Sequence, residues 1–207
     1  MKKVSLILTI VVLTVILFST SGYAQTVTIG SQVWTSKNLD VATYRNGDVI
    51  PQVQDPNAWR TLTTGAWCYY DNDASNGTKY GKLYNWYAVN DPRGLAPNGY
   101  HIPTDAEWTQ LSDYLGGESE AGTKMKSTRG WVENGNGTNS SGFSGLPGGG
   151  RDYTGTFYDV GKTGGWWSST ENNTSSAWTR YLNYPNGNVY RNVNSKTYGF
   201  SVRCLRD

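Results

Sequence analysis

Turn-forming residues divide this chain into short apolar segments, which restricts it to short strands joined by long loops. Glycine occurs 25 times in 207 residues, and asparagine, serine and threonine fill many positions between the apolar ones. Aromatic residues make up 14% of the chain, including nine tryptophans and fifteen tyrosines, which is too many for a disordered protein. This composition is typical of a loop-rich extracellular domain built of short strands.

The first 24 residues have the pattern of a secretory signal peptide. Two lysines precede an apolar run over residues 4–18, and small residues follow it up to Ala24. A membrane span needs about 20 apolar residues, so the run is short for that role, and an uncleaved anchor is the alternative. We therefore predict cleavage near Ala24, one domain over residues 25–207 with no membrane span, and a location in the periplasm, at the cell surface or outside the cell.

The predicted domain carries almost no net charge. The whole chain has 18 basic and 16 acidic residues, and the two lysines of the signal peptide account for the excess. Because no basic stripe is visible in the remaining sequence, we predict no nucleic-acid partner.

Two cysteines, Cys68 and Cys204, form an even pair, which in an exported chain suggests a disulfide. The bridge would tie the C-terminal strand to the middle of the domain. In the chain-entropy picture, a loop of this length stabilises the fold by about 4–5 kcal/mol. Two free buried thiols are the alternative.

The stretch GYHIPTDAEWTQL contains the only histidine of the chain, His101, together with two acids. Thr104 and Glu107 have the spacing of a capping box, and an apolar face follows at helical spacing to Leu115. We predict a helix here, in which the acids stabilise the helix start and are not catalytic. Without a cysteine or second histidine nearby, His101 is predicted to be a hydrogen-bonded structural residue.

The other elements follow from alternation and turn signals. We predict hairpins within residues 26–39 and 177–193, strands at 65–70 and 198–207, a strand or helical turn at 83–89, and a short helix at 120–126. Residues 51–64 are predicted as loop and residues 71–81 as a polar turn. In the last strand, Phe200, Val202 and Cys204 share a face that we expect to be buried.

Tryptophan and tyrosine faces stack on sugar rings and on protein partners, but most tryptophans in a small domain fill its core. Trp167 and Trp178 stand beside polar loop residues and are predicted at the surface. The tryptophans predicted to be buried are Trp34, Trp67, Trp86, Trp108 and Trp166.

Asparagine and tyrosine alternate near the C-terminus, where seven asparagines lie between Asn172 and Asn194. Adaptable binding surfaces use this mixture, because tyrosine supplies rigid contact area and asparagine supplies hydrogen bonds. A polar hairpin with solvent-facing asparagines is the alternative. The candidate ligand-binding residues are Arg151, Tyr153, Trp167, Glu171, Trp178, Tyr184, Asn186, Asn188, Tyr190 and Asn192.

Oxygen-bearing side chains at alternate positions make Asp71 and Asp73 candidate calcium ligands. The segment departs from an EF-hand loop, since the glycine at its sixth position is missing and Lys82 stands where the bidentate glutamate belongs. A polar turn is therefore the preferred interpretation, and calcium is the only cofactor considered.

Eight motifs, in order over nearly all of residues 25–207, resemble the Fibrobacter succinogenes major paralogous domain, a family of exported and surface proteins found notably in the Bacteroidetes. They are IGSQVWTSKNL, RNGDVIP, GAWCYYDND, NGTKYGKLYNWYAV, GYHIPTDAEW, LPGGGRDYTGTFYDVG, WWSSTE and YGFSVRC. Two of them, GYHIPTDAEW and GFSVRC, are also similar to motifs of the formylglycine-generating enzyme and C-type-lectin-like superfamily. This resemblance implies an α+β fold with short irregular antiparallel sheets, one or two flanking helices and long loops.

The same resemblance bears on catalysis and on the binding face. Cys204 lies at the closing motif, where the resemblance implies a structural disulfide partner, so that the two thiolates of the copper-dependent oxidases are absent. The iron-dependent sulfoxide synthases use several histidines, and this chain has one. Diversified C-type-lectin-like proteins vary a segment before a closing Gly-Phe motif, which points to a ligand face at Asn172–Tyr198.

We therefore expect a secreted, non-catalytic module that binds a glycan or a protein at the cell envelope or surface. One alternative is an extracellular polysaccharide hydrolase that uses acids such as Asp152, Asp159 or Glu171. A structural or adhesion component is the other, and it predicts an apolar patch or an exposed sheet edge.

Overall fold

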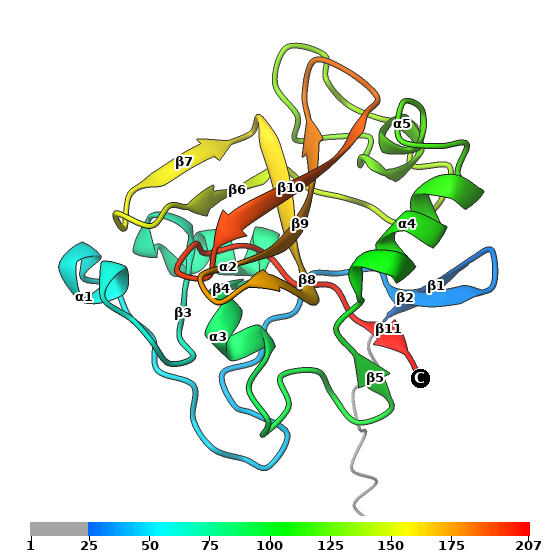
Figure 1. The fold of residues 1–207 in the computed structure, drawn as a ribbon. Helices are drawn as coiled ribbons and strands as arrows, with labels where there is room; N and C mark the ends of the chain where they lie inside the picture. The colour runs from blue at the N-terminus through cyan, green and yellow to red at the C-terminus, as the bar shows by residue number, and fades with distance from the viewer. Residues whose placement is uncertain (1–24) are drawn as a thin grey trace, which may run out of the picture.

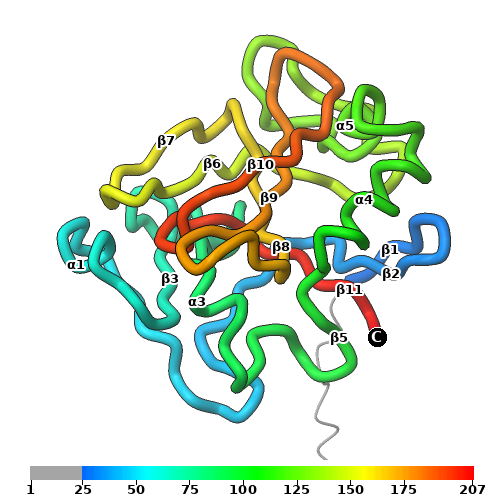
Figure 2. Tube along the Cα trace, viewed as in Figure 1, coloured from blue at the N-terminus to red at the C-terminus, as the bar shows by residue number. Residues whose placement is uncertain are grey.

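Three small sheets are joined by the C-terminal segment, which runs between them (Figures 1 and 2). The computed structural model describes residues 25–207, and the predicted signal peptide, residues 1–24, lies outside the described residues. The mixture of helices and mainly antiparallel strands is the predicted α+β class. Within residues 25–207, no helix has the length and apolar character needed to cross a membrane.

The four-stranded sheet has the order β1-β2-β11-β5. Its strands are β1 (Thr26–Ile29), β2 (Gln32–Thr35), β11 (Leu205–Arg206) and β5 (Tyr100–His101). The first two form the predicted hairpin, with Val27 opposite Trp34 and a turn at Gly30, whose φ of +61° favours glycine. The strand predicted at 198–207 is shorter than expected, because most of that segment makes only isolated bridges.

The five-stranded sheet has the order β10-β9-β8-β6-β7, and all its pairs are antiparallel except β6 with β8. Its strands are β6 (Gly148–Arg151), β7 (Phe157–Val160), β8 (Thr163–Asn173), β9 (Ser176–Asn183) and β10 (Val189–Ser195). The predicted C-terminal hairpin is confirmed as β9 and β10. A third sheet pairs β3 (Trp67–Cys68) with β4 (Leu83–Tyr84).

The predicted capping-box helix is α4 (Asp105–Tyr114). Glu107 N donates to Thr104 Oγ1 at 3.3 Å, and Thr104 N donates to Glu107 Oε2 at 2.7 Å, as the sequence pattern requires. The short helix predicted at 120–126 is α5 (Ala121–Met125), and residues 83–89 contain both β4 and α3 (Trp86–Val89).

Two further helices lie where we predicted a loop, at residues 51–64, and a polar turn, at residues 71–81. They are α1 (Pro56–Arg60) and α2 (Ala74–Tyr80), and α2 follows a 3-10 turn, η1 (Tyr70–Asn72). Each begins at an aspartate cap: Asp55 accepts from Ala58 N at 2.7 Å and Asp73 accepts from Ser75 N at 2.8 Å. Their sequences lack an apolar period, so the caps were the only local signal of these helices.

The five tryptophans predicted to be buried all lie in the core. The prediction that Trp167 lies at the surface is wrong: its side chain is 0% exposed, and its Nε1 donates to Tyr84 O at 2.8 Å. It faces the C-terminal segment, where Phe200 packs edge-on against it at 5.0 Å between ring centroids.

The predicted disulfide is absent, and Cys68 and Cys204 are both free and buried. Cys68 belongs to a core cluster with Trp59 and Leu83, whereas Cys204 belongs to another with Phe200, so each thiol is packed among different neighbours. Burial raises the pKa of each thiol to about 12. The C-terminal segment is instead held by hydrogen bonds, such as Cys204 N to Thr35 Oγ1 at 3.1 Å.

His101 has the structural role predicted for it, between two carboxylates. Its Nδ1 lies 2.8 Å from Asp207 Oδ1 and its Nε2 lies 3.0 Å from Glu107 Oε1. Burial lowers the pKa of His101, but the hydrogen bonds and charges of Asp207 and Glu107 outweigh it, and the pKa is raised above 6.5. The charged ring can donate to both acids.

This pair of contacts predicts a pH-dependent stability. The protonated His101 stabilises the fold fully below pH ~6.5, and this stabilisation is lost as the pH rises through the raised pKa of His101 in the folded state. Because His101 is partly exposed, His101→Gln is expected to remove no more than about 1 kcal/mol of the free energy of unfolding. Urea denaturation at pH 5.5 and pH 8.5 should show the larger loss at the lower pH, and an equal loss at both would contradict this role.

Candidate functional site

A cleft of about 440 Å³ opens on the five-stranded sheet, and we call it the tyrosine cleft. Residues of strands β7 to β10, of the β6–β7 loop and of the C-terminal segment line this cleft. Its lining residues are Tyr158, Tyr181 and Tyr198, Asn183, Asn192 and Asn194, Asp152 and Asp159, and Thr163.

Strand alternation selects the residues that face the cleft. In β9, Tyr181 and Asn183 share one face, whereas Arg180 and Leu182 point to the opposite face. Antiparallel pairing then brings the asparagines of β10 alongside, with Asn192 opposite Thr179. The cleft is thus built on paired strands, which hold its side chains in fixed register.

The opposite face of this hairpin is fixed to α4 by one acid. Asp105 accepts from Arg180 Nη1 at 2.5 Å and from Arg191 Nη2 at 2.9 Å. Burial raises the pKa of Asp105, but the two guanidinium groups outweigh that effect and hold the pKa below its usual value. Asp105 therefore has a structural role beyond the predicted stabilisation of the helix start.

Aromatic rings form one wall of the cleft. Tyr198 stacks on Phe200 with 5.6 Å between centroids and an interplanar angle of 25°. Tyr153, which is 56% exposed, lies 5.9 Å from Tyr198, and Tyr158 lies 6.5 Å from it on another side. Tyr153 therefore extends the aromatic surface from the cleft to solvent.

Neutral hydrogen-bonding groups form a second part of the cleft, beside the carboxylates of Asp152 and Asp159. Burial is the largest cause of the raised pKa of Tyr158 and of Tyr181. Asn194 Nδ2 donates to Thr179 Oγ1 at 2.8 Å, and Thr163 Oγ1 donates to Asn183 Oδ1 at 3.0 Å. The tyrosines are therefore protonated at neutral pH, and the cleft offers hydroxyl and amide groups to a ligand.

Two of the three candidate hydrolase acids lie in the cleft. Asp152 Oδ1 accepts from Thr154 N at 2.8 Å and from Thr156 N at 3.0 Å, so this oxygen holds the β6–β7 turn together. Asp159 is exposed and has a left-handed φ of 57°. Glu171 lies outside the cleft, where it forms an ion pair with Lys196.

The predicted ligand-binding residues are only partly brought together. Asn192 lines the cleft and Tyr153 adjoins it. The structure corrects the prediction for Arg151, which is 0% exposed and donates to the carbonyl oxygens of Val53 and Gln54 at 2.7 Å each. Trp167 is likewise inside the core, so neither side chain offers a surface to a ligand.

The tip of the β9–β10 hairpin has mainly structural contacts. Asn186 Nδ2 donates to the Tyr190 hydroxyl at 2.8 Å, and Asn188 N donates to Asn186 Oδ1 at 3.0 Å. Lys126 Nζ donates to Asn186 O at 2.8 Å, which docks the tip beside α5, and Tyr184 packs against the core. These four candidates stabilise the hairpin, and none of them lines the tyrosine cleft.

Trp178 and the calcium candidates lie away from the cleft. Trp178 is half-buried beneath the guanidinium of Arg191, 3.3 Å from its ring centroid. Asp73 caps α2, and hydrogen bonds from Ser75 lower the pKa of its carboxyl. Asp71 precedes it in the 3-10 turn, and no three His, Cys, Asp or Glu side chains within residues 25–207 form a group that could hold a metal ion.

Sequence reasoning predicted part of the cleft. The predicted ligand face at Asn172–Tyr198 contains five of its nine lining residues, and Asp152 and Asp159 were named as candidate acids, whereas Tyr158 and Thr163 were not singled out. The alternation of Tyr181 and Asn183 along β9 was an available signal, because both fall on the face of Asn192 once the hairpin register is known. Nothing local indicated that Tyr158 would join them, since its position depends on the pairing between β6 and β7.

The family comparison matches the sequence model of the Fibrobacter succinogenes major domain to residues 27–206. The chain belongs to this family. Comparison with curated proteins found no significant match, and comparison with solved structures found none either. The residues that line the tyrosine cleft all lie inside the stretch that matches the Fibrobacter succinogenes major domain.

Proposed function

We propose that this Fibrobacter succinogenes major domain is a non-catalytic, carbohydrate-binding module and that the tyrosine cleft is its binding site. The observation that carries the proposal is the exposed ring of Tyr153 beside Tyr198, next to hydroxyl and amide groups and the carboxylates of Asp152 and Asp159. A sugar presents apolar C–H faces and many hydroxyls, and such a surface complements both.

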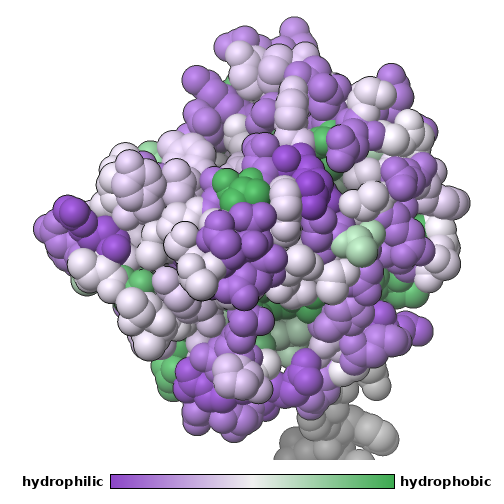
Figure 3. All heavy atoms as spheres, in the orientation of Figure 1, coloured by the Kyte–Doolittle hydropathy of each residue, from purple (hydrophilic) through white to green (hydrophobic). Residues whose placement is uncertain are grey.

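The placement and surface of the domain support this proposal. The signal-peptide pattern supports a role at the cell envelope or surface, where glycans are abundant. The capping-box helix, the short sheets and the closing Gly-Phe motif support a C-type-lectin-like arrangement. On the face shown in Figure 3, hydrophilic residues dominate and apolar residues form small separate spots, which favours a polar ligand over an apolar assembly surface.

A glycan array tests the proposal with a matched pair of variants. Tyr153→Ala combined with Asn192→Ala removes two exposed groups at the cleft, and it is expected to weaken binding of the best glycan by about tenfold or more. Tyr114→Ala is the control, because Tyr114 is 66% exposed on α4 and does not line the cleft. The control is expected to bind like the wild type.

Thermal unfolding of each variant separates loss of binding from loss of fold. Repeating the array with and without calcium tests the Asp71 and Asp73 candidates, which would be supported by a calcium-dependent hit that Asp71→Asn abolishes. Absence of glycan binding by folded protein would overturn the proposal and redirect the search to a protein partner.

A second function is favoured by the presence of Asp152 and Asp159 in the same cleft. Glycoside hydrolysis uses two carboxylates that flank the scissile bond. Incubation with any bound glycan, followed by measurement of new reducing ends, distinguishes the two functions. Turnover that is lost in both Asp152→Asn and Asp159→Asn would establish a hydrolase, whereas the binding proposal predicts no turnover by the wild type.

A further inference from the structure

A second and larger pocket lies where the loop after β2 meets α2 and the loop between α5 and β6. Its volume is about 1010 Å³, and it shares no lining residue with the tyrosine cleft. Four basic side chains line it: Lys37, Lys79, Arg129 and Arg203. The one acid in its lining, Asp40, is paired with Lys82 at 2.5 Å. We call this site the basic pocket.

The rim of the basic pocket carries three cations that have no ion pair and no side-chain hydrogen bond, although Lys79 Nζ lies over the ring of Tyr80, 4.6 Å from its centroid. Lys37, Lys79 and Arg129 are exposed, and none forms an ion pair or a side-chain hydrogen bond with residues 25–207. Only three other exposed lysines and arginines of the described chain share that property. These are Arg60, Lys162 and Arg206, and none of them lines the pocket. In a domain with almost no net charge, half of the exposed lysines and arginines that lack both an ion pair and a side-chain hydrogen bond therefore line one pocket.

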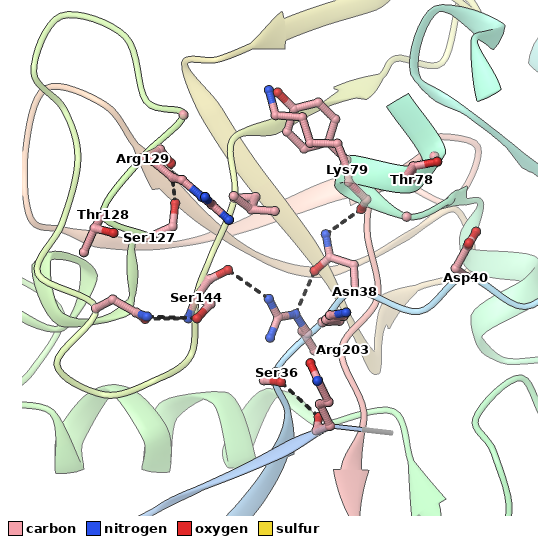
Figure 4. Close-up of a pocket in the computed structure, with 18 residues that line it drawn as sticks. Ser36, Asn38, Asp40, Thr78, Lys79, Ser127, Thr128, Arg129, Ser144 and Arg203 are labelled. Atoms are coloured by element: carbon pink, nitrogen blue, oxygen red, sulfur yellow. Dashed lines mark hydrogen bonds between the residues drawn. The ribbon is translucent and has the colours of Figure 1, made fainter. Parts of the chain in front are cut away.

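Arg203 forms part of the pocket wall and is 1% exposed (Figure 4). Its Nε donates to Asn38 Oδ1 at 2.7 Å, and its Nη2 donates to Ser144 O at 3.2 Å. The two protons of Nη1 are used by the carbonyl oxygens of Thr35 and Phe143. One of the five N–H donors, on Nη2, has no acceptor among the described residues.

The charge of Arg203 is also uncompensated. All its hydrogen-bond partners are neutral oxygens, its guanidinium lies over the ring of Phe143 at 4.4 Å, and no carboxylate of residues 25–207 pairs with it. Burial lowers the pKa of Arg203 to about 9. An anion in the pocket would supply the missing counter-charge and favour the protonated guanidinium.

Hydroxyl and amide groups line the remaining walls. Figure 4 shows Ser36 and Asn38 beside Arg203, with Ser127, Thr128 and Arg129 on one side and Thr78 and Lys79 on another. The C-terminal end of α2 also borders the pocket and would oppose an anion, but Asn38 Nδ2 donates to Tyr80 O at 2.8 Å and reduces that effect. These groups suit a ligand rich in hydroxyls.

We propose that the basic pocket binds an acidic saccharide, with Lys37, Lys79 and Arg129 contacting its sulfate or carboxylate groups and with the exposed hydroxyls of Thr78 and Thr128 contacting its hydroxyls. The site is separate from the tyrosine cleft and does not depend on the function proposed there. The rim cations supply long-range attraction, and the polar walls distinguish a sugar from a simple ion.

Calorimetric titration of the purified protein tests the proposal with three saccharide probes of equal length. A sulfated oligosaccharide and an oligogalacturonate are expected to bind, and a neutral glucan oligosaccharide is expected to bind at least about tenfold more weakly. The affinity for the acidic probes should fall as sodium chloride rises from about 0.05 M to about 0.5 M. Comparison of the affinities for the sulfated oligosaccharide and for the oligogalacturonate shows whether the pocket prefers sulfate or carboxylate groups.

Two triple variants with the same change in net charge provide the control. Lys37→Gln/Lys79→Gln/Arg129→Gln is expected to weaken binding of the acidic probe by about tenfold or more, because several modest ion pairs are lost together. Arg60→Gln/Lys162→Gln/Arg206→Gln removes three exposed cations outside the pocket and is expected to bind like the wild type. All six positions are exposed, so both variants should fold, which thermal unfolding verifies.

Several results would overturn the proposal. Equal loss of affinity in both triple variants would show that the acidic probe responds only to the net charge of the protein and not to the basic pocket. Equally tight binding of the neutral probe, or of a single-stranded DNA oligonucleotide of the same charge, would show that an acidic saccharide is not the ligand class. Failure of the wild type to bind either acidic probe would also reject it.

Discussion

Replacing Asp105 with asparagine is expected to lower the free energy of unfolding by about 3–5 kcal/mol, the usual effect of breaking a buried ion pair. Asp105 neutralises Arg180, whose side chain is 2% exposed, through a contact of 2.5 Å. The buried Nε of Arg180 lacks a hydrogen-bond partner, and its other acceptors, such as Thr109 Oγ1 at 3.0 Å, are neutral, so no second carboxylate of the described chain neutralises the guanidinium. Urea denaturation of the wild type and the variant measures the difference.

Arg191→Gln is the matched control, because it removes the other cation that binds Asp105. The Arg191 side chain is 39% exposed, so its loss is expected to lower the free energy of unfolding by no more than about 1 kcal/mol. The two arginines hold the pKa of Asp105 below its usual value. The ionised Asp105 therefore stabilises the fold at pH values above its unfolded-state pKa of about 3.9. This stabilisation is lost as the pH falls through the lower pKa of Asp105 in the folded state. Equal losses in both variants would contradict this assignment.

Trp108→Ala is the second change expected to have a large effect, with a loss of about 3–5 kcal/mol in the free energy of unfolding. Trp108 is 0% exposed, and its ring lies 4.7 Å from Trp34, 5.8 Å from Phe143 and 6.4 Å from Trp166 between centroids. Removing it opens a cavity at the centre of an aromatic cluster that joins α4 to two sheets. Denaturation by urea or heat should detect the loss directly.

Phenylalanine at two neighbouring positions distinguishes packing from hydrogen bonding. The Nε1 of Trp108 has no hydrogen-bond partner in the described chain, whereas the Nε1 of Trp166 donates to Asn38 Oδ1 at 2.9 Å. Trp108→Phe is therefore expected to destabilise the protein less than Trp166→Phe, since only the latter loses a hydrogen bond. The reverse order would show that the environment of the Trp108 indole differs from the one described.

Local signals predicted the elements that are specified by neighbouring residues. The capping box predicted α4, and turn residues predicted the β1–β2 and β9–β10 hairpins. The burial of five tryptophans was predicted from the number and size of these residues, and Trp167 was wrongly predicted at the surface. Its polar neighbours in sequence suggested exposure, but alternation along β8 turns it towards Phe200.

The site depended on information that no local pattern contains. The tyrosine cleft requires the pairing of β6 with β7 and the path of the C-terminal segment, which bring Tyr158 and Tyr198 to Tyr181. The disulfide was inferred from the count and setting of the cysteines, and neither reveals which core cluster each thiol enters. Arg151 was predicted as a ligand-binding residue, yet its guanidinium donates to backbone carbonyls in the interior.

The C-terminal segment determines when this protein can finish folding. Residues 199–201 bridge to Arg151, Tyr84 and Trp166, and Leu205 then pairs with both β2 and β5. The links between the three sheets thus form only after residues 199–206 have been made, and the contact of Thr35 with Cys204 spans 169 positions. Such non-local pairing slows folding. A nascent chain that does not yet include residues 199–206 therefore lacks the contacts that link its three sheets.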